Sequence, residues 1–95
     1  MVFVCVRVLG PLEDLFGGRE LVIDVPKGSS VENLLCLIEA RGGEKMQTLM
    51  YCNNGVRNEW VRILLNGRDI RFLTEEKLFL EKDDVVHIMP TLGGG

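Results

Sequence analysis

The chain has 95 residues, of which 46% are hydrophobic and 26% charged, and its formal net charge is −3 at pH 7. This size fits one domain with a single core, and the apolar content excludes intrinsic disorder. The 11 basic residues are scattered among 14 acidic ones, which argues against a nucleic-acid partner. We expect a cytoplasmic protein without membrane contact, because no apolar stretch could span a bilayer and no signal peptide is visible.

The first two expected elements are strands. Residues 2–8, "VFVCVRV", alternate between two faces, with Val4 and Val6 on the face that we expect to be buried. A connection with one helical turn, "GPLEDLFGG", leads to a second strand in "RELVIDVP", which ends at Pro26. We expect these two strands to pair antiparallel.

The clearest helix signal follows in "PKGSSVENLLCLIEARGG". Ser30 can cap its start, Ser29 with Glu32 offers an alternative capping register, and Gly42 is placed to end the helix. One apolar stripe, suited to lie across a sheet, consists of Val31, Leu34, Leu35 and Ile38.

The remaining elements are shorter. Residues 46–50 suggest a short second helix, and residues 53–55 suggest a turn. The stretch "VRILLNGRDI" predicts a strand closed by the tight-turn dipeptide Asn66-Gly67, and "EKDDVVHIM" predicts the last strand after an acidic turn. The positions that we expect to point inward are Val61, Ile63, Leu65, Val86 and Ile88.

This order of elements predicts an α+β roll in which a mixed sheet of about four to five strands packs on one main helix. It is the β-grasp arrangement, and the helix follows the hairpin as in ubiquitin-type domains. We expect residues 1–92 to form this domain and residues 93–95 to form a flexible C-terminal glycine tail.

The tail directly follows a strand that we expect to be central. Gly93, Gly94 and Gly95 have no side chains, so the tail can thread into a channel where any side chain would clash. A carboxylate at its end would become a good electrophile only after activation, normally as an acyl adenylate. This pattern predicts a carrier whose chemistry takes place on its own C-terminus, although a frayed end without function is the alternative.

A docking surface is expected on the sheet face away from the helix. An exposed sheet face that mixes apolar and charged side chains is typical of an interface. The alternative is that the second short helix or a loop covers it, and His87 there is more simply a surface histidine than an acid or base. The candidate partner-binding residues are Phe3, Arg62, Leu64, His87, Met89 and Leu92.

No other chemistry is indicated. Cys5, Cys36 and Cys52 are too dispersed for a disulfide framework or a zinc site, so we expect reduced, mostly buried thiols and no metal. The glycine pairs lack the phosphate-loop pattern. The acidic residues between 75 and 84 are most simply a solvated turn.

The blocks "ILLNGRDIRFL" and "LEKDDVVHIMPTLGGG", with the helix start "SSVENLLCLI", resemble the MoaD/ThiS family of sulfur carriers. The likeness is greatest to the small subunit of molybdopterin synthase. It covers nearly the whole chain and is weakest from about residue 44 to residue 60.

The resemblance implies a mechanism that needs partners. A ubiquitin-activating-type enzyme would consume ATP to adenylate the Gly95 carboxylate, and a sulfurtransferase would convert it to a thiocarboxylate. The large subunit of molybdopterin synthase would then use this sulfur to build the dithiolene of molybdopterin. The chain would bind no cofactor and would have no activity alone.

Two departures leave the sulfur acceptor open. Many family members carry Pro-Pro before the last few residues, whereas this chain has Met89-Pro90-Thr91-Leu92, and Gly93 is an additional glycine. The ending "TLGGG" also resembles the ubiquitin-related modifiers that serve tRNA thiolation or protein conjugation. A plain interaction domain with a glycine tail is the remaining alternative.

Overall fold

The computed structural model describes residues 1–10, 13–14, 17–50 and 61–90. Its first two strands, β1 (Val2–Val8) and β2 (Glu20–Val25), pair antiparallel with Val4 opposite Ile23. This confirms the predicted hairpin, whose alternating residues place Val4, Val6 and Val8 in the core. Of the connection between the strands, Glu13 and Asp14 are helical, while residues 11–12 and 15–16 lie outside the described residues.

The helix α2 (Val31–Met50) begins where the sequence predicts. The Ser30 hydroxyl accepts a hydrogen bond from the Asn33 amide at 3.1 Å, and the Asn33 side chain accepts one from the Ser30 amide at 3.0 Å. This reciprocal cap satisfies two amides at the helix start, with Asn33 in the place that a glutamate often takes. Ser30, rather than Ser29 with Glu32, is therefore the capping residue.

The predicted helix end at Gly42 was wrong. The helix continues through Gly42 and Gly43 to Met50, so the predicted separate helix at residues 46–50 is the last part of α2. A glycine inside a helix costs only about 1 kcal/mol relative to alanine. The sequence that follows, "EKMQTLM", consists mostly of strong helix formers, which carry the helix across the two glycines. The predicted turn at residues 53–55 lies outside the described residues.

The second half of the chain begins with a short hairpin. Strand β3 (Val61–Leu65) turns through Asn66 and Gly67 into β4 (Arg68–Asp69), with positive φ angles of 50° and 87° at the two turn residues. These angles are those of a type I′ turn, as the Asn-Gly dipeptide predicted. Two 3₁₀ turns, η1 (Ile70–Phe72) and η2 (Glu75–Leu78), then lead to β5 (Val85–Pro90).

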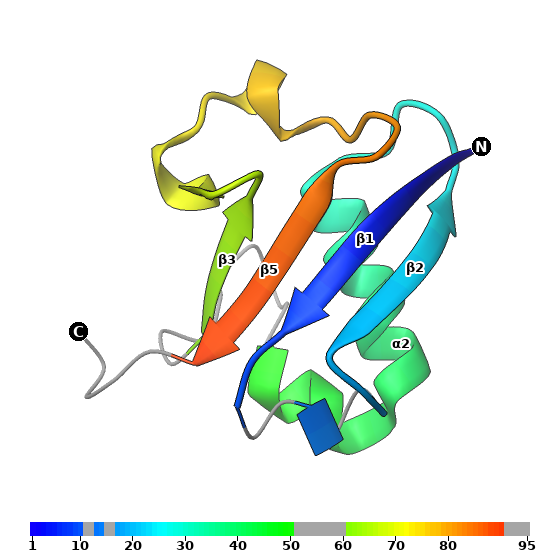
Figure 1. Cartoon of the computed structure of the whole chain (residues 1–95), viewed down its shortest axis with the longest axis vertical. Coiled ribbons are helices and arrows are strands. Elements are labelled where there is room, and N and C mark those ends of the chain that lie inside the picture. The colour runs from blue at the N-terminus through cyan, green and yellow to red at the C-terminus, as the bar shows by residue number, and fades with distance from the viewer. Residues whose placement is uncertain (11–12, 15–16, 51–60, 91–95) are drawn as a thin grey trace.

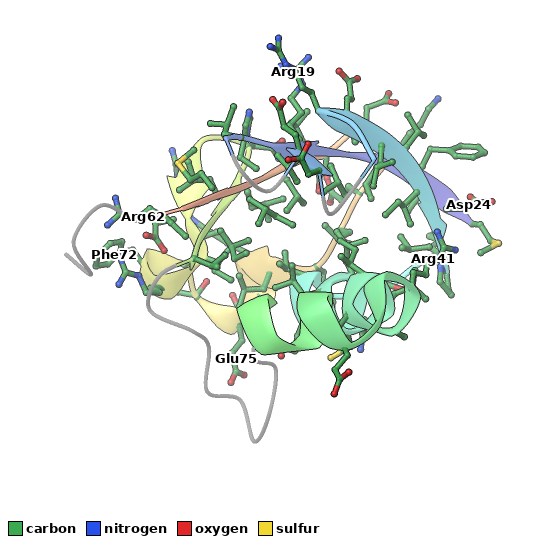
Figure 2. All side chains as sticks on the ribbon, turned by 90° about the horizontal axis from the view of Figure 1, so that it is seen from below. Arg19, Asp24, Arg41, Arg62, Phe72 and Glu75 are labelled. Carbon is green, nitrogen blue, oxygen red and sulfur yellow. The ribbon has the colours of Figure 1, made fainter. Side chains whose placement is uncertain are left out.

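The strands form one mixed sheet in the order β2-β1-β5-β3-β4 (Figure 1). Strand β5 lies at its centre, parallel to β1 and antiparallel to β3. Helix α2 crosses one face, and side chains fill the space between the two layers (Figure 2). The predicted α+β architecture, a five-stranded mixed sheet on one main helix in the β-grasp arrangement, is thus confirmed.

The core lies between the helix and the sheet. All of the positions predicted to point inward are buried, and Leu34, Val86 and Ile88 have no exposed surface at all. Leu80, from the segment after η2, closes the core at one end. The buried side chains are Val4, Val6, Val8, Ile23, Val25, Val31, Leu34, Leu35, Ile38, Val61, Ile63, Leu65, Leu80, Val86 and Ile88.

Candidate functional site

The candidate site is built on β5, the strand that leads to the glycine tail. Strand β5 pairs with β1 from Val85 to Ile88 on one side and with β3 from Val86 to Pro90 on the other. The last described residue, Pro90, lies opposite Val61 of β3. Residues 91–95, which include Leu92 and the three glycines, lie outside the described residues, so their expected roles stay predictions. The tail therefore starts from the central strand of the sheet, at an end that pairs with β3.

The start of β5 is fixed by the turn between β3 and β4. The Asn66 side chain accepts a hydrogen bond from the Val85 amide at 2.9 Å and donates one to Asp84 at 3.0 Å. The other Asp84 oxygen accepts from the Glu81 amide at 2.8 Å. Asp84 is therefore a structural residue that organises the entry to β5, whereas the sequence suggested only a solvated acidic turn.

Four of the predicted partner-binding residues lie together on the outer face of the sheet. On this face, His87 lies between Arg7 of β1 and Leu64 of β3, and Met89 lies opposite Arg62. All four predicted residues, Arg62, Leu64, His87 and Met89, are partly exposed. Helix α2 covers the opposite face, so the predicted second helix does not cover this one (Figure 2). The four residues form a patch beside the base of the tail.

Phe3 lies apart from this patch. Strand β1 pairs with β5 from Cys5 to Val8, so Phe3 lies beyond the start of β5, four residues from the position beside His87. At about 3.3 Å per residue, this separation is roughly 13 Å. Phe3 is 58% exposed and neighbours Asp24 of β2 instead. The predicted set therefore falls into one patch near the tail and one separate aromatic residue.

The His87 ring is only partly accessible. Its Nδ1 atom is buried and has no hydrogen-bond partner among the described residues. A buried polar atom without a partner is destabilising unless a later contact satisfies it. This atom is thus a place where a bound partner could supply a hydrogen-bond donor or acceptor.

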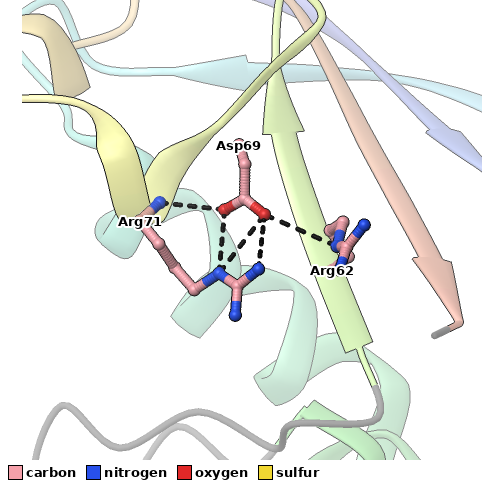
Figure 3. A network of polar contacts seen from close by, with 3 residues as sticks. All are labelled: Arg62, Asp69 and Arg71. Carbon is pink, nitrogen blue, oxygen red and sulfur yellow. Dashed lines mark hydrogen bonds and ion pairs between the residues drawn. The ribbon is translucent and has the colours of Figure 1, made fainter. Parts of the chain in front are cut away.

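A charged network that the sequence did not predict joins β3 to η1 (Figure 3). The Asp69 carboxylate caps η1 by accepting from the Arg71 amide at 2.9 Å, and it binds the Arg71 guanidinium through Nε and Nη2 at 3.2 and 2.9 Å. Arg62 Nε lies 3.5 Å from the same carboxylate. Burial alone would raise the pKa of Asp69, but these hydrogen bonds and charges outweigh it and hold the pKa below its usual value.

A second contact on the outer face involves Cys5. Its thiol donates a hydrogen bond to Glu20 at 3.3 Å, and Glu20 also lies 3.6 Å from the Arg7 guanidinium. Burial raises the pKa of the Cys5 thiol, the hydrogen bond to Glu20 raises it further, and Arg7 opposes the effect. A thiol held in its protonated form is a weak nucleophile, so this arrangement does not indicate a catalytic cysteine.

The cysteines are less buried than expected. Cys36 is exposed and Cys5 is partly exposed, which corrects the prediction that the thiols are mostly buried. Neither thiol forms a disulfide within the part of the chain that the structure describes, and Cys52 lies outside that part. The described residues contain no group of three or more His, Cys, Asp or Glu side chains placed to hold a metal ion. Within that same part of the chain, no helix is long and apolar enough to cross a membrane.

Comparison with known proteins identifies the family. Residues 6–95, which run from the second half of β1 through the helix and the other strands to the glycine tail, match the ThiS family. The chain belongs to the ThiS family. Members of this family are ubiquitin-like sulfur carriers, which work with ubiquitin-activating-type enzymes and with partner subunits.

Relatives of this ThiS-family chain carry different descriptions. It is 33% identical over 98 residues to ubiquitin-related modifier 1 of Yarrowia lipolytica, with 97% of this chain and 98% of the relative covered. A Pyrococcus furiosus structure, provisionally assigned as molybdopterin converting factor subunit 1, has a TM-score of 0.72 and 25% identity and covers 97% of this chain and 100% of that one.

A third relative supports the fold alone. The small archaeal modifier protein 1 of Methanosarcina acetivorans has a TM-score of 0.78 and 23% identity, with 100% of this chain and 98% of that one covered.

Proposed function

We propose that the chain carries sulfur as a thiocarboxylate on Gly95. The observation that carries this proposal is the family match, which extends from the β-grasp domain through the terminal glycines. The central position of β5 supports it, because the tail follows a strand that pairs with β1 up to Ile88 and with β3 up to Pro90. The proposal requires Gly95 to bear the free carboxylate.

The chemistry would take place on partner enzymes. A ubiquitin-activating-type enzyme would join the Gly95 carboxylate to the α-phosphate of ATP, releasing pyrophosphate. The persulfide sulfur of a sulfurtransferase would then displace AMP to form an acyl disulfide, and a thiol would reduce this disulfide, releasing the sulfurtransferase and leaving the thiocarboxylate. The contribution of this chain is to present the tail: three consecutive residues without side chains can enter a narrow active site, and β5 provides the rigid base.

The outer-face patch would dock the partner that receives the tail. Leu64 and Met89 supply apolar contact area, and His87 supplies a buried Nδ1 without a partner among the described residues. An apolar centre with a few polar groups is typical of protein interfaces. Because Met89 and Pro90 adjoin the tail in sequence, a partner on this patch would hold the tail close to its own active site.

The first recipient that we propose is molybdopterin synthase, with this chain as the small subunit. The C-terminal sequence block supports this, as does the Pyrococcus furiosus structure, which has 25% identity and covers 97% of this chain and 100% of that one. The large subunit would bind the tail and pass the sulfur to the pterin precursor.

A second candidate is a ubiquitin-related modifier that serves tRNA thiolation or conjugation to lysines. It is favoured by the 33% identity to ubiquitin-related modifier 1 of Yarrowia lipolytica over nearly the whole of both chains. In this case, the same thiocarboxylate would supply sulfur to a tRNA-modifying enzyme or form an amide with a protein.

An exchange assay tests the shared first step. Adenylation of the carrier makes the activating enzyme return labelled pyrophosphate to ATP. We expect this exchange with the full chain and none with a variant that lacks Gly94 and Gly95. Equal exchange with both proteins would contradict the proposal.

The thiocarboxylate form of the protein is then used to identify which acceptor receives the sulfur. Dithiolene formation in the presence of a molybdopterin synthase large subunit and the pterin precursor supports the first recipient. Lysine adducts or thiolated tRNA in cells, without dithiolene formation, support the second.

A further inference from the structure

One corner of the molecule carries an unusual exposed pair. Phe72 is 82% exposed, the largest exposure of any large hydrophobic side chain in the described part of the chain. The Arg71 guanidinium carbon lies 5.6 Å from the centre of its ring, a distance typical of a cation–π contact. We call Arg62, Asp69, Arg71 and Phe72 the Arg71 corner; Figure 2 shows Arg62 and Phe72 at the same end of the molecule.

Arg71 is held in place before any partner binds. The Nε and Nη2 atoms of Arg71 donate hydrogen bonds to the Asp69 carboxylate. The Asp69 side chain is only 11% exposed and also contacts Arg62. In Figure 3, the second terminal nitrogen of Arg71 points away from Asp69. An arginine that is already immobilised loses little side-chain entropy on binding, and its outward N–H groups match a carboxylate.

The charge of this corner differs from that of the whole chain. Arg62, Arg68 and Arg71 lie within ten residues of one another, with Asp69 as the acidic residue between them, in a chain whose net charge is −3. The corner is therefore positively charged. Positive patches and exposed aromatic residues together favour a partner surface that offers carboxylates beside an apolar group.

The corner also lies beside the base of the tail. Arg62 of β3 is opposite Met89 of β5, and the neighbouring residue Val61 is opposite Pro90, after which the tail begins. Asp69 forms ion pairs with both Arg62 and Arg71. This network therefore links Arg71 and Phe72 to β3 near its pairing with the end of β5. A protein that takes up the tail would approach this corner.

We propose that the Arg71 corner docks an acidic segment of the protein that receives the C-terminal tail. In this arrangement, a carboxylate of that segment binds the outward edge of Arg71, and a neighbouring apolar side chain packs on Phe72. The inference rests on the proposed carrier function, since it names the chemistry by which the tail's partner is recognised.

Nucleic acid fits the corner less well. Glu75 and Glu76 begin η2 three residues after Phe72, and Glu81, Asp83 and Asp84 follow. These carboxylates would repel the phosphates of an extended nucleic acid strand, and by the same repulsion they limit an acidic protein partner to a short segment that contacts the corner alone.

Steady-state adenylation measures the contribution of the corner to docking. The concentration of carrier that gives half-maximal pyrophosphate exchange is compared for wild type, Arg71→Ala and Phe72→Ala, with kcat measured at saturation. We expect each variant to raise KM about tenfold with little change in kcat, because both residues act in binding rather than chemistry. Matched controls are Arg19→Ala, whose side chain is 83% exposed, and Phe79→Ala, which is 54% exposed, and both should leave KM unchanged.

The outcomes separate the inference from the proposed function. Wild type that is not adenylated would overturn the proposed function and the inference with it. Wild type that is adenylated, with KM unchanged in both variants, would overturn the inference alone. Phe72→Ala leaves the Asp69 network intact. The KM of this variant therefore tests the inference even if Arg71→Ala lowers the melting temperature of the protein.

An acidic peptide tests the chemistry of the partner directly. The probe is acetyl-Glu-Asp-Leu-Glu-Asp-amide, titrated into the ¹⁵N-labelled full chain. We expect shifts of the Arg71 Nε–H signal and of the Ile70–Phe72 amides, and their loss in Arg71→Ala. Shifts elsewhere, or shifts at the corner with an oligouridine probe but not with the peptide, would overturn the inference.

Discussion

The Asn66 side chain offers a graded test of how the turn between β3 and β4 organises β5. Asn66 has a positive φ of 50°, and its side chain makes two hydrogen bonds, from the Val85 amide at 2.9 Å and to Asp84 at 3.0 Å. Replacement by alanine removes both hydrogen bonds and leaves a residue with a Cβ atom, but no compensating side-chain hydrogen bond, in the left-handed backbone conformation. Replacement by glycine removes the bonds but fits the backbone angle.

The magnitudes follow from these two terms. The two partly exposed hydrogen bonds together contribute about 1 kcal/mol, and the left-handed conformation costs alanine about 1 kcal/mol more. We therefore expect Asn66→Ala to lower the free energy of unfolding by about 2 kcal/mol and Asn66→Gly by about 1 kcal/mol. The exposed neighbour Lys82 serves as the control, and Lys82→Ala should stay within about 0.5 kcal/mol of wild type.

Urea denaturation measures all three variants. The midpoint should fall in the order Lys82→Ala, Asn66→Gly, Asn66→Ala, with the slope m unchanged because the native surface stays the same. An equal loss for glycine and alanine would refute the backbone term. A loss below about 0.5 kcal/mol for both would refute the assigned hydrogen bonds.

Three further predictions follow from the core, the Asp69 network and the thiols. Ile88→Ala should destabilise the fold by about 3 kcal/mol in urea, against about 1 kcal/mol for Ile88→Val, because the side chain is fully buried; similar losses for both would contradict this packing. Asp69→Asn should lower stability by about 1 kcal/mol at pH 7. Because the pKa of Asp69 is lower in the folded state than its unfolded value of about 3.9, the charged carboxylate stabilises the fold above that pH, and the stabilisation is lost as the pH falls through the folded pKa. The difference between wild type and Asp69→Asn should therefore vanish at low pH. A constant difference in thermal melts down to pH 2 would argue against the assigned charge. Iodoacetamide at pH 8 should label the exposed Cys36 before Cys5. Glu20→Gln should speed the labelling of Cys5, because it removes the carboxylate that, after burial, raises the pKa of this thiol. Equal labelling rates of the Cys5 peptide in wild type and Glu20→Gln, measured by peptide mapping, would contradict this.

Local patterns in the sequence were sufficient for much of the fold. Alternation placed Val4 and Ile88 in the core, and the Asn-Gly dipeptide located the turn at residues 66–67, because both signals depend on neighbouring residues alone. The end of α2 could not be predicted in this way. Gly42 resembles a helix stop, but the strong helix formers after it override the signal.

The candidate site shows the limit of sequence reasoning more clearly. The patch of Leu64, His87 and Met89 follows from strand alternation, and the tail chemistry follows from glycine composition and family resemblance. The Asp69 network was missed because the predicted turn at Asn66-Gly67 was not followed to its pairing, which places Asp69 opposite Leu64 and within reach of Arg62 on the same hairpin. Part of its signal was present, since an aspartate before "IRF" can cap a short helical turn by bonding the amide two residues on. The separation of Phe3 from the patch depends on the register of β1 against β5, which no local pattern specifies.

The central claim, that Gly95 carries sulfur, is tested most directly by the intact mass of the protein. The chain is incubated with ATP, its activating enzyme and a sulfur donor, beside a variant that lacks Gly95. The account predicts a gain equal to the exchange of one oxygen atom for sulfur, located on the C-terminal peptide, in the full chain alone. An unchanged mass with an enzyme that is demonstrably active on another carrier would contradict it.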